Sequence, residues 1–266
     1  MAYKDARKAT GLYAAEVQRT KQVTPHMVRV TLVGEDLGAL PQRGFDHWFR
    51  LFLPSAGEQT DFARLPDRFG IGGYLKYLRT PAGTRPVCRS YTVREHRPEL
   101  RELDIDFVAH GDTGVAGPWA QKAQPGERVV LLDQGVGFEP APGTDFHLFA
   151  GDESALPAIG GILRDLPRDA RGLAVIEVPD AADAQDVEAP DGVEVRWLPR
   201  TDPQARAGSL ALAEVRAFTP ADPATLSAYL VGEQALPTEG RRHLVAHGVP
   251  KDRITFIGFW RHGRTS

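Results

Sequence analysis

The sequence contains one cysteine, Cys88, among 266 residues. A single cysteine excludes an internal disulfide bond and any metal site built from cysteines alone, and it is compatible with a reducing compartment. No run of about 18 apolar residues occurs, and residues 1–20 lack the apolar core that a signal peptide needs. We therefore expect a cytoplasmic protein with no membrane partner, in which Cys88 is a strand residue and not a catalytic thiol.

A large excess of one charge is also missing, because the formal net charge is −3. Nucleic-acid-binding proteins are usually basic overall, so we expect no nucleic-acid partner. The composition, with 42% hydrophobic and 25% charged residues, is typical of a soluble globular protein. A chain of this length is typical of two domains of ordinary size.

Three familiar chemical patterns are absent as well. No Ser/His/Asp constellation is evident, so a hydrolase is not expected. His243 and His247 lie four residues apart, but no HExxH pattern and no third ligand accompany them, which favours a solvated helix face and no metal site. The glycine pattern GxGxxG of dinucleotide-binding folds does not occur either.

The first half of the chain alternates strand-like runs with turn residues. Six runs rich in β-branched and aromatic residues, with one short helical stretch after Gly114, predict an antiparallel six-stranded β-barrel over residues 1–140. The Gly-rich segment 68–86 is expected to be a long surface loop. The predicted strands are 13–20, 26–35, 46–54, 88–94, 102–112 and 127–135.

A Pro/Gly-rich linker at 139–145 separates this half from a regular β/α alternation. The alternation predicts an α/β domain of the nucleotide-binding type over residues 141–266, with a parallel sheet and crossover helices. Ser154 is the expected N-cap of the first helix, and Pro157 is tolerated in its first turn. The predicted strands are 146–152, 172–180, 193–200, 226–233 and 253–260, and the predicted helices are 154–167, 209–218 and 236–248.

The stretch CRSYTVR at 88–94 carries unusual polar groups for a strand. Arg89 offers a planar fork that matches phosphate oxygens, Tyr91 an aromatic face, and Thr92 a hydroxyl for a ring nitrogen or oxygen. These are the groups that a flavin site needs. An exposed strand with Tyr91 on the core side is the alternative. Strand alternation places Arg94 on the face of Thr92, and its role stays open.

A second motif follows in DIDFVAHGDTGVAGPWA at 104–120. A strand ends at His110 and Gly111, and a turn through Gly114 leads into a short helix that carries Trp119. A glycine-rich turn at a helix N-terminus presents N–H groups to an anion, and His110 can donate to a phosphate.

With these motifs the chain resembles the siderophore-interacting proteins, which are flavin-dependent ferric-siderophore reductases of the ferredoxin-reductase-like superfamily. The matching stretches occur in the expected order and span most of the chain. They are DHWFRLFLP, RSYTVR, LDIDFVAHGDTGVAGPWA, AGDESALPAI, WLPR, LVGE and GFWRHG.

The resemblance implies that FAD is bound in the barrel, reduced by NAD(P)H and reoxidised by ferric iron in a siderophore. Tyr91 and Thr92 are then the residues nearest the flavin ring and are assigned as catalytic. The sequence departs from the family pattern with Asp133-Gln134 in place of Gly-Pro, Arg50 in place of Lys and Phe259 in place of Tyr. The implied FAD-binding residues are Arg89, Ser90, Tyr91, Thr92, Asp106, Phe107, Val108, His110, Gly111, Gly114 and Trp119.

The donor site is expected at the first β/α turn of the second domain. Asp152 and Glu153 there suit the helix dipole but would repel a diphosphate in the usual position. The nucleotide would then lie differently, with Arg200 on a 2′-phosphate; the alternative is that the two carboxylates merely cap a helix. The nicotinamide-binding residues assigned are Gly151, Asp152, Glu153, Ser154 and Arg200. Some family members prefer ferredoxin, so ferredoxin stays open as donor and partner.

Ferric siderophores of the catecholate type are anionic, so the substrate side should be basic. Residues 43–101 contain eleven Lys and Arg against six Asp and Glu, which would steer an anion to this part of the chain unless its loops are simply basic. The substrate-binding residues assigned are Arg50, Lys76, Arg79 and Arg261. A flavin reductase with another acceptor and a non-catalytic carrier of ferric siderophore are the alternative functions.

Overall fold

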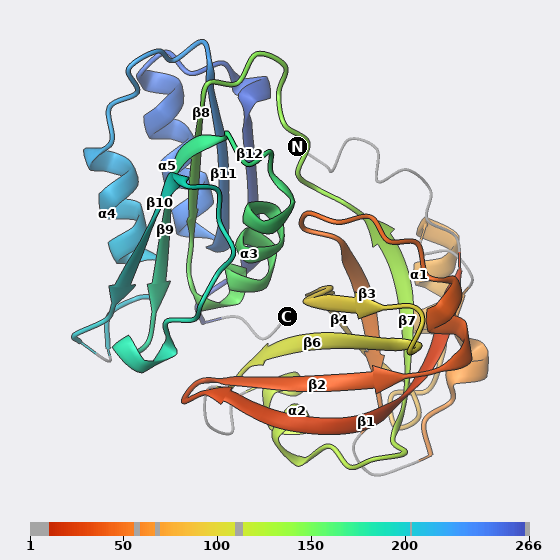
Figure 1. Ribbon diagram of the computed structural model, residues 1–266. Helices are drawn as coiled ribbons and strands as arrows, with labels where there is room; N and C mark the ends of the chain where they lie inside the picture. Colours follow the sequence, from red (N-terminus) through yellow and green to blue (C-terminus); the bar gives the residue numbers. More distant parts are fainter. Residues whose placement is uncertain (1–10, 56–58, 67–69, 110–113, 203, 264–266) are drawn as a thin grey trace. The chain divides into compact units, whose positions relative to one another are not determined.

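The computed structural model describes residues 11–55, 59–66, 70–109, 114–202 and 204–263. The chain divides into two compact units (Figure 1). The first contains most of the chain up to Gly137, and the second contains Phe138–Ser266 with two short segments, Thr24–His26 and Gly44–Asp46.

The N-terminal unit is built on an antiparallel sheet in the order β4-β3-β7-β1-β2-β6-β5. Six of its strands correspond to the six that the sequence predicts, and the seventh, β5, is a three-residue strand that the prediction missed. The strands are β1 (Leu12–Thr24), β2 (Met27–Val33), β3 (Trp48–Leu53), β4 (Val87–Thr92), β5 (Glu95–Arg97), β6 (Glu102–Val108) and β7 (Arg128–Gly135).

The two edges of this sheet meet, as a barrel requires. Strands β4 and β5 stand at opposite ends of the strand order, yet only Val93 and Arg94 connect them along the chain. The Arg94 amide donates to the Asp104 carbonyl on β6 at 2.9 Å, and Val93 donates to the His47 carbonyl. The sheet therefore curls around its buried apolar core, and the predicted antiparallel β-barrel class is confirmed.

One expectation for this unit was wrong, because the segment 68–86 is not a continuous loop. It contains a helix, α1 (Ile71–Leu78), although Gly72 and Gly73 stand in its first turn. Tyr77 holds the helix against the barrel: its ring lies 6.1 Å from that of Phe52, and its hydroxyl donates to the Pro86 carbonyl. Tertiary packing of Tyr77 thus outweighs the low helix propensity of glycine.

The remaining helices of the N-terminal unit are short. The predicted helix after Gly114 is present as α2 (Ala116–Lys122). Gly117 lies against the end of β6, where a Cβ atom would approach the Val108 carbonyl oxygen to 2.9 Å, so a larger residue would push the helix away. Two 3₁₀ turns complete the unit, η1 (Glu35–Ala39) and η2 (Phe62–Arg64).

The C-terminal unit has a five-stranded sheet in the order β10-β9-β8-β11-β12, and all neighbouring strands are parallel. This confirms the predicted α/β domain. Its strands are β8 (Phe146–Gly151), β9 (Arg171–Val178), β10 (Gly192–Pro199), β11 (Leu226–Glu233) and β12 (Ile254–Trp260). Its helices are α3 (Leu156–Asp165), α4 (Ser209–Ala217) and α5 (Ala235–Ala246), with 3₁₀ turns η3 (Glu153–Ala155), η4 (Ala181–Asp183) and η5 (Lys251–Arg253).

Helices cover both faces of this sheet: α4 and α5 lie on one face and α3 on the other (Figure 1). This follows from right-handed crossovers, since β8 connects through α3 to one side of the sheet, and the later crossovers run to the other side. Leu212, Val215 and Leu244 from α4 and α5 join the apolar core with residues of β8 and β11.

The first helix of this unit begins differently from the prediction. Asp152, and not Ser154, is the capping residue: its carboxylate accepts from the Ser154 amide at 3.0 Å at the start of η3. Helix α3 then continues from Leu156 with Pro157 in its first turn, as expected. Within the residues that the structure describes, no helix is long and apolar enough to cross a membrane.

Candidate functional site

The two faces of β4 separate the polar groups of the CRSYTVR stretch. Val87, Tyr91 and Val93 pack toward the apolar core of the barrel, and alternation places Arg89 with them. Cys88 packs on the opposite face, in the apolar cluster of Phe52. Thr92 and Ser90 share that opposite face, so Tyr91 and Thr92 point to different sides of one strand.

Tyr91 belongs to a group of three aromatic rings that the fold assembles from three elements. Its ring centroid lies 4.3 Å from that of Phe107 on β6, and Phe107 lies 5.6 Å from Trp119 on α2. Phe107 is fully buried, whereas Tyr91 and Trp119 are partly exposed. Three of the predicted cofactor residues are thus brought together into one aromatic wall.

The position of β4 at the edge of the strand order lets a flat ligand contact both of its faces. Its partner β3 pairs on one side, with Phe49 opposite Tyr91 and Leu51 opposite Arg89. β4 has no strand partner on its other side in this sheet, and a ligand lying there can contact the Tyr91 ring and the Thr92 hydroxyl. This arrangement would let side chains on opposite faces of β4 contact one flat cofactor.

The protonation state of Tyr91 is set by its burial and by the neighbouring Arg89. Burial raises the pKa of Tyr91 well above its usual range, although Arg89 opposes the shift, so the phenol stays neutral. The Arg89 guanidinium donates to the Cys88 carbonyl at 2.8 Å, and no ion pair to a carboxylate is present among the described residues. The remaining N–H groups of this fork suit a phosphate.

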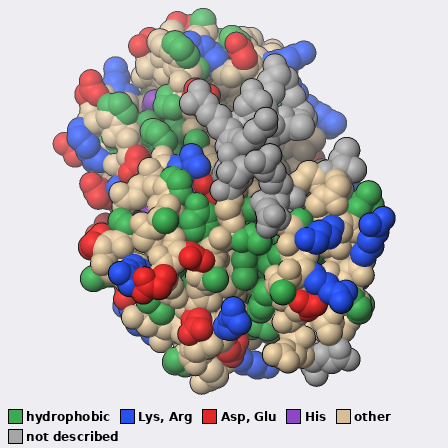
Figure 2. Space-filling model, turned by 90° about the vertical axis from the view of Figure 1, so that its right-hand side faces the viewer, with side chains coloured by type: hydrophobic (Ala, Val, Ile, Leu, Met, Phe, Trp, Pro, Cys, Tyr) green, Lys and Arg blue, Asp and Glu red, His purple; other side chains and the backbone are tan. Residues whose placement is uncertain are grey.

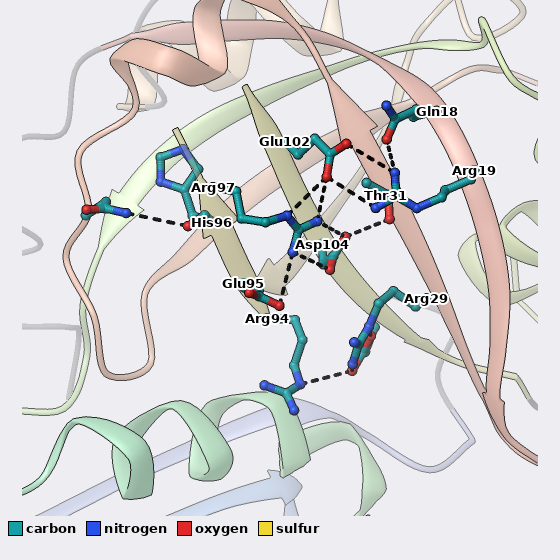
Figure 3. A network of polar contacts seen from close by, with 12 residues as sticks. Gln18, Arg19, Arg29, Thr31, Arg94, Glu95, His96, Arg97, Glu102 and Asp104 are labelled. Atoms are coloured by element: carbon teal, nitrogen blue, oxygen red, sulfur yellow. Dashed lines mark hydrogen bonds and ion pairs between the residues drawn. The ribbon is translucent and has the colours of Figure 1, made fainter. Parts of the chain in front are cut away.

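Asp106 takes part in a polar network on the outer face of β2 and β6 (Figure 3). Its buried carboxylate accepts two hydrogen bonds from Arg29, at 2.7 and 2.9 Å, and Arg94 lies 3.4 Å away. Arg94 is therefore a partner of Asp106 on the barrel surface. The assignment of Asp106 to the cofactor stays a prediction, and these ion pairs already engage its side chain.

The same network continues along β6 toward β1 and β5. Arg97 bridges Glu102 and Asp104 with four hydrogen bonds of 2.9–3.0 Å (Figure 3). Thr31 donates to Asp104, and Arg19 donates to Glu102. The hydrogen bonds from Arg19 lower the pKa of Glu102 to about 2, although its partial burial acts against them. These ion pairs thus stabilise β6, the strand that carries Phe107, against its neighbouring strands.

Asp133, one of the departures from the family pattern, anchors two basic side chains. Its carboxylate lies 2.9 Å from His47 Nε2 and accepts from Arg43 at 2.8 and 3.0 Å. Burial alone would raise the pKa of Asp133, but the bonds from His47 and Arg43 lower it to about 2. The departure therefore has a structural role in the barrel.

Several predicted residues receive no contact that defines their role. His110 and Gly111 lie outside the described residues, so their part in a diphosphate site stays a prediction. Gly114 is exposed and adopts a φ of 81°, which favours glycine at this turn. Val108, at the end of β6, is half-buried.

The predicted substrate residues fall on both units. Arg50 projects on the Cys88 face of the barrel; burial raises the pKa of the Cys88 thiol, and Arg50 acts against this shift. Lys76 and Arg79 are exposed on and beside α1, next to exposed Tyr74 and Leu75. Figure 2 displays Lys and Arg side chains interspersed with hydrophobic ones on its face of the molecule. Arg261 is exposed in the C-terminal unit directly after β12.

Much of the charge of residues 43–101 is neutralised by ion pairs. Among the residues of that segment that the structure describes, five basic side chains pair with carboxylates, and most of those carboxylates lie elsewhere in the chain. They are Arg43 with Asp133, Arg64 with Asp61, Arg94 with Asp106, Arg97 with Glu102, and Arg101 with Glu35. The steering field that the segment can supply is therefore smaller than its composition indicates.

The predicted donor residues meet at the carboxyl edge of the parallel sheet. Arg200, after β10, donates to both oxygens of Glu153 at 2.8 Å and to Glu177 at 3.0 Å. Its side chain is 9% exposed, so it would have to leave both carboxylates to reach a 2′-phosphate. Asp152 is fully buried, and burial together with Glu153 raises its pKa to about 7 against the donors that hold the carboxylate.

Glu177 and Glu233 also belong to this edge, although the sequence reasoning did not single them out. Both side chains are completely buried near the ends of β9 and β11. The available signal was a lone glutamate inside the apolar run GLAVIEV, because a buried charge demands partners.

Each of the two units matches a known family model. Residues 16–137 match the model of the siderophore-interacting FAD-binding domain, and residues 144–263 match that of the siderophore-interacting protein family. The chain belongs to the siderophore-interacting protein family. Its N-terminal unit is accordingly the FAD-binding domain, and the exposed edge of β4, the fork of Arg89 and the aromatic wall at Tyr91 fit that cofactor.

Relatives cover nearly the whole chain. A ferric vibriobactin reductase, ViuB, from Vibrio cholerae is 36% identical over 92% of this chain and 88% of its own length. An NADPH-dependent ferric-chelate reductase from Escherichia coli is 30% identical over 92% of this chain and 91% of its own length. The crystal structure of a siderophore utilization protein from T. fusca superposes with a TM-score of 0.80 at 32% identity, covering 97% of this chain and 95% of that one.

Proposed function

We propose that this protein is an FAD-dependent reductase that transfers electrons from NAD(P)H to ferric siderophores and releases ferrous iron in the cytoplasm. The observation that carries the proposal is the edge strand β4, which offers Arg89 and Tyr91 to a flavin within the matched FAD-binding domain. Relatives over more than nine-tenths of the chain are named as ferric reductases, one of them NADPH-dependent, which supports the same activity here.

The chain contributes positioning and electrostatics to this reaction. When bound, FAD can accept two electrons at once from a nicotinamide and pass them on one at a time to ferric iron. Neither the nicotinamide nor the siderophore can do this alone. Arg89 would hold a phosphate of FAD, the neutral Tyr91 ring would pack beside the flavin, and the Thr92 hydroxyl would bond to the ring edge. No protein nucleophile or bound metal is needed, because the iron is the substrate and its ferrous form binds hard oxygen ligands more weakly.

Rapid mixing under anaerobic conditions tests the proposal. The flavin absorbance of the holoprotein should bleach with NADH or NADPH, and a ferric catecholate siderophore should then restore it with the appearance of ferrous iron. Reduced ferredoxin serves as the comparison donor. A reduced protein that reacts with oxygen or free flavin, but not with ferric siderophore, would instead favour a general flavin reductase. A colourless protein that cannot take up FAD would favour a non-catalytic carrier.

The substrate zone yields a separate prediction. Arg50→Ala and Arg261→Ala should each raise KM for an anionic ferric siderophore about tenfold, because each removes one charge-assisted contact. Steady-state kinetics with a ferric catecholate measure the effect, and an unchanged flavin spectrum verifies that FAD is retained. Arg216→Ala, an exposed arginine paired with Glu239, is the control. Unchanged KM in both variants would refute these two assignments.

A further inference from the structure

The carboxyl edge of the parallel sheet is where α/β folds usually bind a dinucleotide, with the diphosphate at a helix N-terminus. In this chain the N-terminus of α4 is already filled. The Glu177 carboxylate accepts hydrogen bonds from the amides of Gly208 at 2.9 Å, Leu210 at 2.8 Å and Ala211 at 3.2 Å. These are the donors that a phosphate would otherwise use.

At the N-terminus of α5 a second buried glutamate holds the first helix amide. Glu233, the last residue of β11, accepts from the Ala235 amide at 2.8 Å and from the His262 amide at 3.1 Å. Arg206 donates to the same carboxylate at 2.6 Å. Because the Glu233 side chain is completely buried, a phosphate could reach these amides only by displacing it.

The Asp152 carboxylate occupies a third helix N-terminus at this edge, the start of η3 and α3. It accepts from the amides of Ser154 and Glu233, at 3.0 and 2.6 Å, and from the Trp260 indole at 3.1 Å. Gly232 makes room for it, since a Cβ atom there would lie 2.8 Å from the Asp152 carboxyl carbon. In dinucleotide-binding folds a glycine leaves space for a phosphate near the backbone. Here Gly232 leaves that space for the Asp152 carboxylate.

The charge balance of the buried edge also opposes an anion. Three buried glutamates, Glu153, Glu177 and Glu233, stand against the guanidinium groups of Arg200 and Arg206, and the carboxyl group of Asp152, whose pKa is raised to about 7, lies beside them. Both arginines already pair with these carboxylates. A diphosphate would therefore meet a negative field, and the amides of Ser154, Gly208, Leu210, Ala211 and Ala235 already donate to these carboxylates.

We propose that Asp152, Glu177 and Glu233 exclude the donor's diphosphate from the helix N-termini, so that the donor is bound through its nicotinamide half. The proposal rests on NAD(P)H as the electron donor of the proposed function. It makes these carboxylates specificity-determining residues: they remove the affinity that a dinucleotide ordinarily gains from its diphosphate, and a truncated donor loses little.

The wild-type holoprotein tests this directly with reduced nicotinamide mononucleotide, which lacks the adenosine half of NADPH together with one phosphate of the diphosphate and the 2′-phosphate. Stopped-flow bleaching of the flavin gives the second-order rate constant for this donor and for NADPH. We expect the two constants to agree within about tenfold. Diphosphate binding at a helix N-terminus would add several charge-assisted hydrogen bonds, each of which raises affinity about tenfold or more. A preference for NADPH above about tenfold would therefore overturn the proposal.

A binding experiment without turnover uses ADP as the diphosphate probe. Glu233→Gln should bind ADP about tenfold more tightly than the wild type in isothermal titration calorimetry, because one buried negative charge is removed beside the helix N-terminus. Glu239→Gln removes an exposed charge from the same helix and should leave ADP affinity unchanged. Equal affinity of Glu233→Gln and the wild type, whether both bind ADP or neither does, would contradict the proposal. The wild-type donor comparison decides the question if Glu233→Gln does not fold.

Failure of the proposed function is distinguishable from failure of this inference. A flavin that both donors bleach at similar rates, but that no ferric siderophore reoxidises, would refute siderophore reduction and support the donor mode. A protein that reduces ferric siderophore but reacts much faster with NADPH than with reduced nicotinamide mononucleotide would support siderophore reduction and refute the donor mode. If no nicotinamide bleaches the flavin, the donor mode is refuted, and dithionite-reduced protein still tests siderophore reduction.

Discussion

Arg89→Ala is expected to bind FAD at least about 10- to 100-fold more weakly than the wild type. The reason is that Arg89 supplies an ionic fork on the inner face of the edge strand, and each charge-assisted hydrogen bond to phosphate contributes about 1.5–3 kcal/mol. No carboxylate pairs with Arg89 in the described part of the chain, so its removal leaves no buried charge behind. Fluorescence titration of the apoprotein with FAD measures the loss.

Two further variants test whether FAD binding depends on the planar geometry of the Arg89 guanidinium or only on its charge. Arg89→Lys keeps a cation but loses the planar geometry, so its affinity for FAD should lie between those of the wild type and Arg89→Ala. Arg101→Ala removes an exposed arginine of the same unit, paired with Glu35, and should bind FAD normally. Full flavin occupancy of Arg89→Ala at wild-type affinity would remove Arg89 from the cofactor site.

Glu177→Ala should destabilise the C-terminal unit by about 3–5 kcal/mol. The substitution leaves three amides at the start of α4 without an acceptor and takes one of two carboxylates from the buried Arg200. Breaking a buried hydrogen-bonded ion pair typically costs this much, because the remaining partners lose their compensation. Urea unfolding of the holoprotein, followed by circular dichroism, should give a clearly lower midpoint.

The matched control is Glu194→Ala, which removes an exposed glutamate paired with Arg196 on the neighbouring strand β10. Exposed ion pairs contribute little, so its free energy of unfolding should change by less than about 1 kcal/mol. Glu177→Gln retains an acceptor for the helix amides and should lie between Glu177→Ala and the wild type. If Glu177→Ala and Glu194→Ala unfold at the same urea concentration, Glu177 does not stabilise the edge.

The helix α1 illustrates where local pattern is insufficient. Paired glycines and the proline that follows predict a loop over 68–86, yet Tyr77 packs on Phe52 and holds eight residues in a helix. Ser154 is a similar case, because a good N-cap residue is displaced by Asp152 two positions earlier. Propensities describe each residue's own preference, and contacts with distant residues override differences of about 1 kcal/mol.

In the candidate site, too, some features follow from the sequence and others depend on tertiary contacts. The grouping of Arg89, Tyr91 and Thr92 follows from the sequence, since three neighbouring positions on a strand cannot be far apart. Their placement on opposite faces follows from the period of two. The aromatic wall does not, because Phe107 and Trp119 reach Tyr91 only through the pairing of β6 and the packing of α2. The ion pair of Arg94 with Asp106 likewise depends on closure of the barrel.

The amino-acid sequence by itself determined the two-domain class, the strand and helix order and the family, because these depend on local periodicity and contiguous motifs. Only the tertiary structure decided what each buried charge does. Asp152, Glu177 and Glu233 lie far apart in the chain, and parallel strand order brings their ends to one edge. There each carboxylate finds backbone amides of a helix that starts after its own or a neighbouring strand. Such pairings are long-range, so no local pattern encodes them.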